Sequence, residues 1–160
     1  MNYNVLLASI IVLIFIIPIV IVYTMTLQWI QKLEESKCKC SESSQRDFIK
    51  YYLYAYLILL GITVVLGFAS VFMEFSKVKW LNALQPFAKF MRMIIAILSF
   101  VNMIVSIIYI SKLKEIDCKC SEDIRREVYY IWSILSLAVN ALFVLFMIVG
   151  ATWLYFVFYK

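Results

Sequence analysis

The residues best suited to chemistry in this chain are four cysteines, which form two Cys-x-Cys pairs in similar local sequences. Cys38 and Cys40 lie in the string Lys-Cys-Lys-Cys-Ser-Glu, and Cys118 and Cys120 lie in Asp-Cys-Lys-Cys-Ser-Glu. Four sulfurs support three kinds of chemistry: a tetrahedral metal site, disulfide bonds, or a thiol-disulfide redox relay. Unbonded thiols in a reducing compartment are a further interpretation. The sequence leaves these interpretations open.

Spacing and composition bear on the choice among them. Only one residue separates the cysteines of each pair, whereas structural zinc sites usually have two or more, and the chain has no His to serve as an auxiliary ligand. Three disulfide pairings are open. A bond within one Cys-x-Cys pair would close a strained ring, so we expect disulfides between the two pairs or with another protein. We predict no cofactor.

The cysteine pairs belong to a longer internal repeat. Residues 30–46 align with residues 110–126 at an offset of 80, and ten of the seventeen aligned positions are identical. In the first copy the identical positions are Ile30, Lys32, Leu33, Glu35, Cys38, Lys39, Cys40, Ser41, Glu42 and Arg46. This pattern predicts a tandem duplication, with one helical hairpin over residues 1–80 and a second over residues 81–160.

Composition indicates which elements position the cysteines. Of the 160 residues, 65% are hydrophobic and 16% are charged, and the mean hydropathy is +0.93, a balance that no small soluble domain can cover with polar surface. The charges leave four apolar runs, each near the roughly 20 residues that a helix needs to cross a bilayer. We therefore predict an all-α integral membrane four-helix bundle, with helices over residues 5–30, 46–75, 86–112 and 122–158.

The cysteine pairs should lie at the tips of the two hairpins. Because each hairpin crosses the membrane twice, both tips are expected on the same side, as in a parallel internal repeat. The orientation is open: Lys and Arg are more frequent around the tips, which favours the cytosol, whereas net charge favours the opposite orientation.

Three residue types after each cysteine pair have expected structural roles. The Ser should cap the second helix of its hairpin, the Glu should complement the positive end of that helix, and the Arg should reach the lipid head groups. These residues, which also form the expected docking surface, are Ser41, Glu42 and Arg46 in the first copy and Ser121, Glu122 and Arg126 in the second.

Tryptophan and asparagine residues mark the membrane ends and interior of the predicted helices. Tryptophans prefer the membrane interface, so we predict an aromatic belt of membrane anchors. Asn102 and Asn140 should lie near mid-depth on neighbouring helices and exchange interhelical hydrogen bonds. A small channel is the alternative interpretation of these polar side chains in the membrane interior. The predicted anchors are Trp29, Trp80, Trp132 and Trp153.

An enzymatic alternative follows from a resemblance to bacterial quinone-linked disulfide oxidases. Those proteins also have four transmembrane helices, cysteine pairs in two loops on one side and an Arg near the membrane surface, for which Arg46 is the counterpart. This sequence departs from that pattern because it lacks a Cys-x-x-Cys pair and because its two loops are copies of each other. A membrane thiol-disulfide oxidoreductase is therefore the second hypothesis.

The tip strings at residues 37–42 and 117–126, followed by Tyr-rich apolar helices, resemble small four-helix membrane proteins of large icosahedral double-stranded DNA viruses. The resemblance covers about twenty residues in each half. It implies a non-enzymatic minor capsid component in the internal membrane of a virion, where virally encoded thiol oxidases make disulfides plausible. The expected partners are the lipid bilayer, other membrane or capsid proteins and a second copy of the chain, but no nucleic acid.

Overall fold

The computed structural model describes residues 3–72 and 79–158. Four α-helices occupy most of this part of the chain: α1 (Tyr3–Glu35), α2 (Ser44–Phe72), α3 (Lys79–Glu115) and α4 (Ile124–Phe158). Two short 3-10 turns, η1 (Lys39–Ser41) and η3 (Lys119–Ser121), form the tips between α1 and α2 and between α3 and α4. The described residues include no strand, and the predicted all-α four-helix class is confirmed.

Each helix contains a segment that is long and apolar enough to cross a bilayer. The large apolar side chains of these segments are mostly exposed on the outside of the bundle, where only hydrocarbon would cover them without cost. The chain is therefore a multi-pass helical membrane protein. The segments are Leu13–Glu35, Ser44–Leu66, Met93–Glu115 and Ile124–Phe156.

Three predicted helix boundaries were wrong. The first helix ends at Glu35 instead of residue 30, and the third ends at Glu115 instead of residue 112, because charged residues continue both helices beyond the apolar run. The third helix also begins at Lys79, so it runs through Pro86, where the sequence predicted a helix start. A proline removes only one backbone donor, which a membrane helix tolerates.

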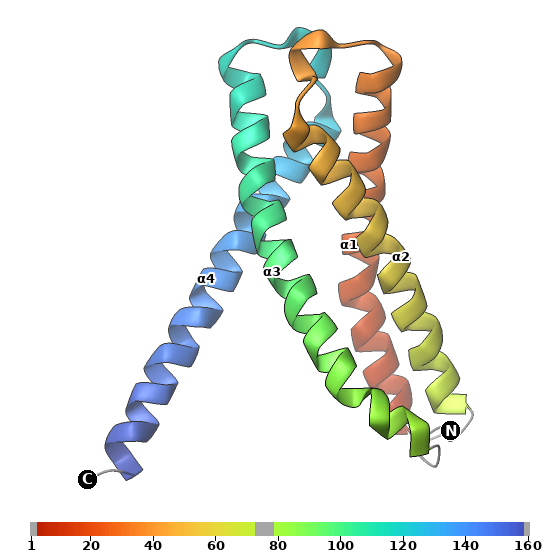
Figure 1. Ribbon diagram of the computed structural model, residues 1–160, viewed down its shortest axis with the longest axis vertical. Coiled ribbons are helices and arrows are strands. Elements are labelled where there is room, and N and C mark those ends of the chain that lie inside the picture. The colour runs from red at the N-terminus through yellow and green to blue at the C-terminus, as the bar shows by residue number, and fades with distance from the viewer. Residues whose placement is uncertain (1–2, 73–78, 159–160) are drawn as a thin grey trace.

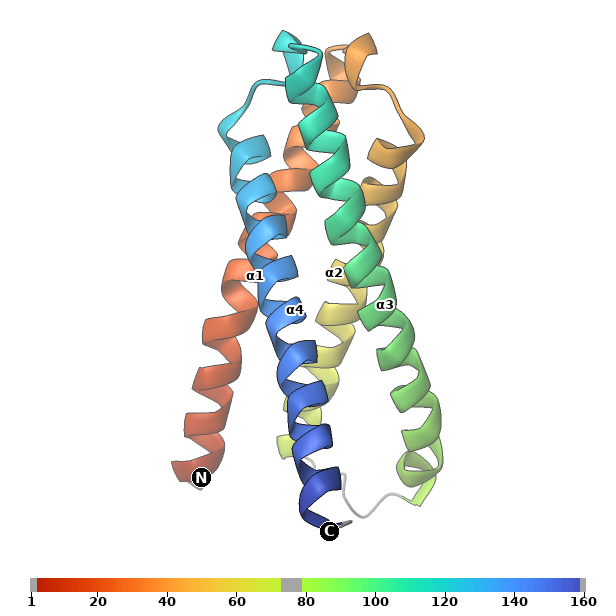
Figure 2. The same cartoon turned by 90° about the vertical axis from the view of Figure 1, so that its left-hand side faces the viewer.

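Both tips lie at the same end of the molecule, as predicted, and the start of α1 and the end of α4 lie at the opposite end (Figures 1 and 2). Each helix packs mainly against two neighbours, in the order α1, α2, α3, α4 and back to α1. Many of the fully buried side chains stand close in sequence to the tips, which shows that the packed core of the bundle lies at this end. They include Ile30, Leu33, Ile49, Leu53, Ile110 and Leu113.

The far half of α4 has a different environment from the other helices. Figure 1 shows this helix leaning away from α1, α2 and α3 as it descends from the tips. Every described side chain from Ala138 to Phe156 is exposed. In a bilayer, lipid or another membrane helix would contact this length of α4.

Candidate functional site at the paired tips

The first helix of each hairpin, α1 in one and α3 in the other, ends in a Schellman motif that reverses the direction of the chain. Lys37 has a φ of 49° and Asp117 a φ of 47°, the left-handed conformation that this motif requires. In the first tip the Lys37 N–H donates to the Glu34 carbonyl and the Cys38 N–H donates to the Leu33 carbonyl, both at 3.1 Å. The second tip repeats these two bonds. The motif explains why the first cysteine of each tip packs against the helix end.

The 3-10 turn that follows gives the two cysteines of a tip different environments. The Ser41 N–H and hydroxyl both donate to the Cys38 carbonyl, at 3.0 and 2.7 Å, and the second tip repeats this arrangement. Cys38 and Cys118 are consequently buried, with 3% and 4% of their surface exposed, whereas Cys40 and Cys120 are exposed. Each tip therefore carries one enclosed sulfur and one that faces solvent.

The sulfurs of the two tips meet in a crossed arrangement. Cys38 lies at disulfide-bonding distance from Cys120, and Cys40 from Cys118, with Cα atoms 6.0 Å apart in both pairs. The sulfurs of Cys38 and Cys118 are 3.7 Å apart, and those of Cys40 and Cys120 are 3.4 Å apart. All four lie within 4.8 Å of one another. This agrees with the expectation that bonds join the tips and do not form within a pair.

Two buried aromatic residues hold each tip against the opposite hairpin. The Trp29 indole N–H donates to the Ser121 carbonyl at 3.2 Å, and the Tyr109 hydroxyl donates to the Ser41 carbonyl at 2.8 Å. The two rings also contact each other, with centroids 6.3 Å apart. Trp29 is only 1% exposed, so its expected role as a membrane anchor is corrected. Its indole nitrogen finds a partner inside the protein and not at the interface.

The helix caps are not the predicted serines. The Ser43 hydroxyl accepts from the backbone N–H of Arg46, and Asp123 Oδ1 accepts from the N–H two residues later, so these two side chains cap α2 and α4. Ser41 and Ser121 lie earlier, each as the last residue of a 3-10 turn, and their hydroxyls donate to the Cys38 and Cys118 carbonyls.

The predicted role of the tip glutamates also needs correction. Glu42 and Glu122 are exposed and precede the helices, closing the 3-10 turns through their backbone N–H groups. The acidic residues in the first turns of α2 and α4 are instead Asp47 and Glu127, where a negative charge complements the helix dipole.

Arg126 does not extend to the head groups as predicted. It is 8% exposed, and its Nη1 donates to the Ser121 hydroxyl while its Nη2 donates to Glu127 Oε1, both at 2.9 Å. Arg46 is less well satisfied. Its Nε is buried without a hydrogen-bond partner, 3.6 Å from Asp47 Oδ1. A buried guanidinium needs such partners, so the two copies differ in how well they stabilise this cation.

One ion pair joins the two hairpins beside the cysteines. Lys32 Nζ on α1 lies 2.9 Å from Asp123 Oδ2 at the start of α4, and the Asp123 side chain is 10% exposed. The backbone N–H of Arg125, followed by the Lys32 ammonium, lowers the pKa of Asp123 below its usual value. This carboxylate therefore caps a helix and contacts the opposite hairpin at the same time.

The expected contact between Asn102 and Asn140 is absent. Asn102 is buried, and its amide and the Ser106 hydroxyl both donate to the Tyr129 hydroxyl, at 2.9 and 3.0 Å. Asn140 is exposed, and its amide donates to the Ser136 carbonyl on its own helix, at 2.7 Å, and lies 4.0 Å from the Met103 sulfur on α3. The pairing was wrong because Asn102 turns into the core toward Tyr129, whereas Asn140 lies on the exposed face of α4. Asn102 does face protein, as predicted.

The other predicted anchors have mixed environments. Trp132 is half-buried against the core, and Trp153 is exposed near the far end of α4, a position that fits an anchor. Trp80 lies outside the residues whose side chains the structure describes. The exposed Trp153 thus remains the clearest candidate for a membrane-interface residue.

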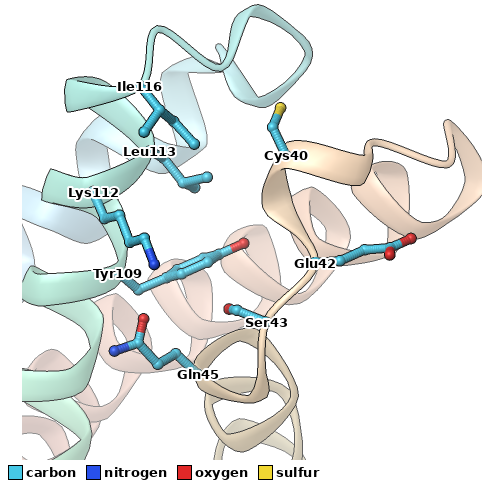
Figure 3. A pocket seen from close by; sticks show the side chains of 8 residues that line it. All are labelled: Cys40, Glu42, Ser43, Gln45, Tyr109, Lys112, Leu113 and Ile116. Carbon is cyan, nitrogen blue, oxygen red and sulfur yellow. The ribbon is translucent and has the colours of Figure 1, made fainter.

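A small cavity adjoins the exposed sulfur of the first tip (Figure 3). Its lining includes Cys40, Ser43, Tyr109 and Lys112, from the first tip and the facing side of α3. Its volume is about 30 Å³. That is room for about one water molecule, whereas small-molecule sites usually occupy roughly 300–1,000 Å³.

The chain matches no protein-family model, no curated protein and no solved structure.

Sequence reasoning missed Tyr109, Ser43 and Asp123 as residues that organise the tips. A signal was present for Tyr109, because it occupies the position 80 residues after Trp29 and both side chains are aromatic donors. Ser43 and Asp123 also occupy equivalent positions, and both are favoured N-cap types. The signal for all three residues is thus a similar side-chain chemistry at equivalent but non-identical positions of the two halves.

Proposed function

We propose that this chain is a structural membrane protein whose four helices present the two joined tips as one platform for a protein partner. The crossed arrangement of the four tip cysteines (Cys38, Cys40, Cys118 and Cys120) supports this proposal most directly. Disulfides between residues 38 and 120 and between 40 and 118 would tie together segments far apart in the sequence. Such links restrict the unfolded chain and typically contribute about 2–4 kcal/mol each.

The outer surface of the platform is polar and carries charges of both signs. Lys39 and Glu42 are exposed on the first tip, and Lys119 and Glu122 are exposed on the second. Complementary charges on a partner would orient it and speed its association. The buried contacts of Trp29 and Tyr109 hold the backbone beneath this surface in place.

The resemblance to membrane proteins of large double-stranded DNA viruses suggests a membrane and a partner. We propose the internal membrane of a virion as the location, with a capsid protein bound to the tips in the manner of a minor capsid component. The exposed length of α4 would face lipid or a further membrane helix in that assembly.

A photocrosslinking experiment in the native membrane tests the platform. A photoreactive residue at position 42 or 122 should crosslink to the same capsid protein, since both tips contribute to one surface. The same residue at position 139, on the exposed part of α4, is the matched control and should not capture that protein. Tips that crosslink to no common protein, or only as strongly as position 139, would contradict the platform.

Replacing all four tip cysteines with Ser tests the structural role of the sulfurs. We expect the variant to lose about 2–4 kcal/mol of stability for each disulfide removed and to bind the partner more weakly, with an unchanged membrane topology. Thermal unfolding in detergent and accessibility labelling measure these effects. Unchanged stability and binding would show that the cysteines do not support the platform.

A membrane thiol-disulfide oxidoreductase is the second candidate, because exposed Cys40 and Cys120 lie next to further sulfurs that are 3.4–3.8 Å away. A dithiol substrate would reduce one tip disulfide, and a quinone would accept the two electrons and two protons. The cavity beside Cys40 is far too small for a quinone. Purified protein that oxidises a dithiol with added quinone, and loses this activity in Cys40→Ser, would establish the enzyme instead.

A further inference from the structure

We propose that the four tip cysteines, when reduced, form a tetrathiolate site for one divalent d10 cation of the zinc type. The site rests on the joined tips of the proposed function and holds the same two segments together without disulfide bonds. Each sulfur is either in a disulfide or a thiolate ligand, so the two states exclude each other. The tips would thus remain joined in both oxidising and reducing surroundings.

The spacing of the sulfurs fits tetrahedral coordination. Sulfurs about 2.3 Å from a central zinc ion lie about 3.8 Å from one another. The four sulfur–sulfur distances outside the two disulfides are 3.7 Å for Cys38 with Cys40, 3.7 Å for Cys38 with Cys118, 3.4 Å for Cys40 with Cys120 and 3.8 Å for Cys118 with Cys120. Only the two bonded pairs must separate, which side-chain rotation allows across Cα distances of 6.0 Å.

The local backbone explains how two cysteines separated by a single residue can bind the same metal ion, although structural zinc sites usually have two or more residues between them. The 3-10 turn brings both sulfurs of a pair to the same side of the chain, as the distances within Cys38–Cys40 and Cys118–Cys120 show. Each tip can therefore act as a bidentate chelator that supplies two sulfur ligands. The contacts of Trp29 and Tyr109 hold the two chelators opposite each other, so little order must be gained on binding.

Burial and charge also suit a cation. Cys38 and Cys118 form a buried base, while exposed Cys40 and Cys120 leave an entry path from solvent. Four thiolates and a divalent ion carry a net charge of −2, and Lys39 and Lys119 lie between the ligands of each pair. Their positive charges favour the thiolate over the thiol.

The conversion of the two disulfides into a metal site can be written as a balanced reaction. Two molecules of a phosphine reductant and two of water convert the two disulfides into four thiols and two molecules of phosphine oxide. A divalent cation then displaces four protons as four metal–sulfur bonds form. Metal binding should therefore tighten as pH rises, because protons compete for the sulfurs.

The test uses the full chain in detergent, reduced with a phosphine and titrated with Co²⁺, whose spectrum reports tetrahedral sulfur coordination. We expect one Co²⁺ per chain with sulfur-to-cobalt charge-transfer bands, displacement by Zn²⁺, and no binding after reoxidation. Intact-mass counting after alkylation needs no variant: Zn²⁺ should protect all four thiols that are otherwise modified. Cys40→Ser should weaken Zn²⁺ binding by more than about 100-fold, because even outer-shell changes cost about 10–100-fold.

Tyr54→Phe is the matched control, since Tyr54 is an exposed residue of α2 and the substitution removes neither a sulfur nor a charge, and it should keep the sulfur-to-cobalt bands. Reduced chain that gives no tetrahedral sulfur spectrum, or that binds one metal ion per two chains, would overturn the proposal. Equal alkylation with and without Zn²⁺ would overturn it too. Because none of these measurements involves a docking partner, loss of metal binding and loss of the platform remain distinguishable.

Discussion

Trp29 and Tyr109 make the same contact with opposite tips. Each side chain is buried and donates one hydrogen bond to a serine carbonyl of the other hairpin, Trp29 to Ser121 and Tyr109 to Ser41. The two donors are 80 residues apart in the sequence, and so are the two acceptors. The two tips are therefore held reciprocally, with one such hydrogen bond from each hairpin to the other.

Tyr109→Phe tests this reciprocal contact. Removing the hydroxyl leaves the Ser41 carbonyl without its donor while the ring still fills its place, so we expect a loss of about 0.5–1.5 kcal/mol. A thiol reductant should also cleave the tip disulfides faster. Tyr54→Phe is the control, because the Tyr54 hydroxyl accepts a bond from Gln31 at an exposed site. Equal thermal midpoints and reduction rates in the two variants would contradict the assigned role of Tyr109.

Trypsin provides a direct test of the sulfur pairing, because Lys39 and Lys119 separate the cysteines of each pair. Digestion of the unreduced protein should release peptide 38–39 linked to peptide 120–125, and peptide 40–46 linked to peptide 115–119. Mass spectrometry distinguishes these products from those of the other two pairings. Peptide 38–39 linked to 115–119 or to 40–46 would show that the crossed pairing is wrong.

Asp47→Glu should stabilise the protein by repairing the weaker of two equivalent ion pairs. Glu127 lies 2.9 Å from Arg126, whereas Asp47, at the matching position, stays 3.6 Å from the unsatisfied Nε of Arg46. One added methylene would close this gap, and we expect a gain of about 0.5–1 kcal/mol in thermal unfolding. The reciprocal Glu127→Asp should lose stability. A lower melting temperature for Asp47→Glu would refute this comparison.

Asp123 should make stability depend on pH. Its pKa is lowered in the folded state, so its contribution is present above the unfolded pKa of about 3.9 and disappears as pH falls through the folded pKa. Asp123→Asn keeps an oxygen for the helix cap but loses the charge facing Lys32, so its deficit relative to the unmodified chain should shrink in acid. Asp117→Asn is the control, since Asn tolerates its left-handed φ of 47°. A deficit that stays constant with pH would exclude the charge effect.

The helices and the common side of the two tips could be predicted from the sequence. They depend on the average hydropathy of long segments and on the number of crossings, and not on single contacts. Apolar runs of sufficient length predict membrane helices wherever they occur, and an even number of crossings brings both tips to one side. The end of α1 at Glu35 was missed because it is set by the left-handed conformation of Lys37, a residue type that seldom adopts it. Leu33 and Cys38, which this motif joins by a backbone hydrogen bond, are both buried, so the packing of the tip favours the conformation.

Side-chain roles were harder to predict, since they depend on the angle between helices. Trp29 was expected at the lipid interface, yet the same amphipathic ring suits a buried site where a backbone carbonyl is within reach. Asn102 and Asn140 were expected at similar depths, but Asn102 bonds to buried Tyr129 while Asn140 is exposed and bonds to the Ser136 carbonyl on its own helix. Hydropathy fixes depth in a membrane and leaves such crossing angles undetermined.

The crossed pairing of the cysteines also imposes an order on biogenesis. Cys38 and its partner are 82 residues apart, and Cys40 and its partner are 78 apart, so neither cysteine of the first tip has its partner until the ribosome has made the second. During that interval the first pair has no access to the crossed bonds. Oxidation between the tips can follow only after the second hairpin has inserted with its tip on the same side. The crossed bonds can therefore be present only in chains whose two hairpins have both inserted.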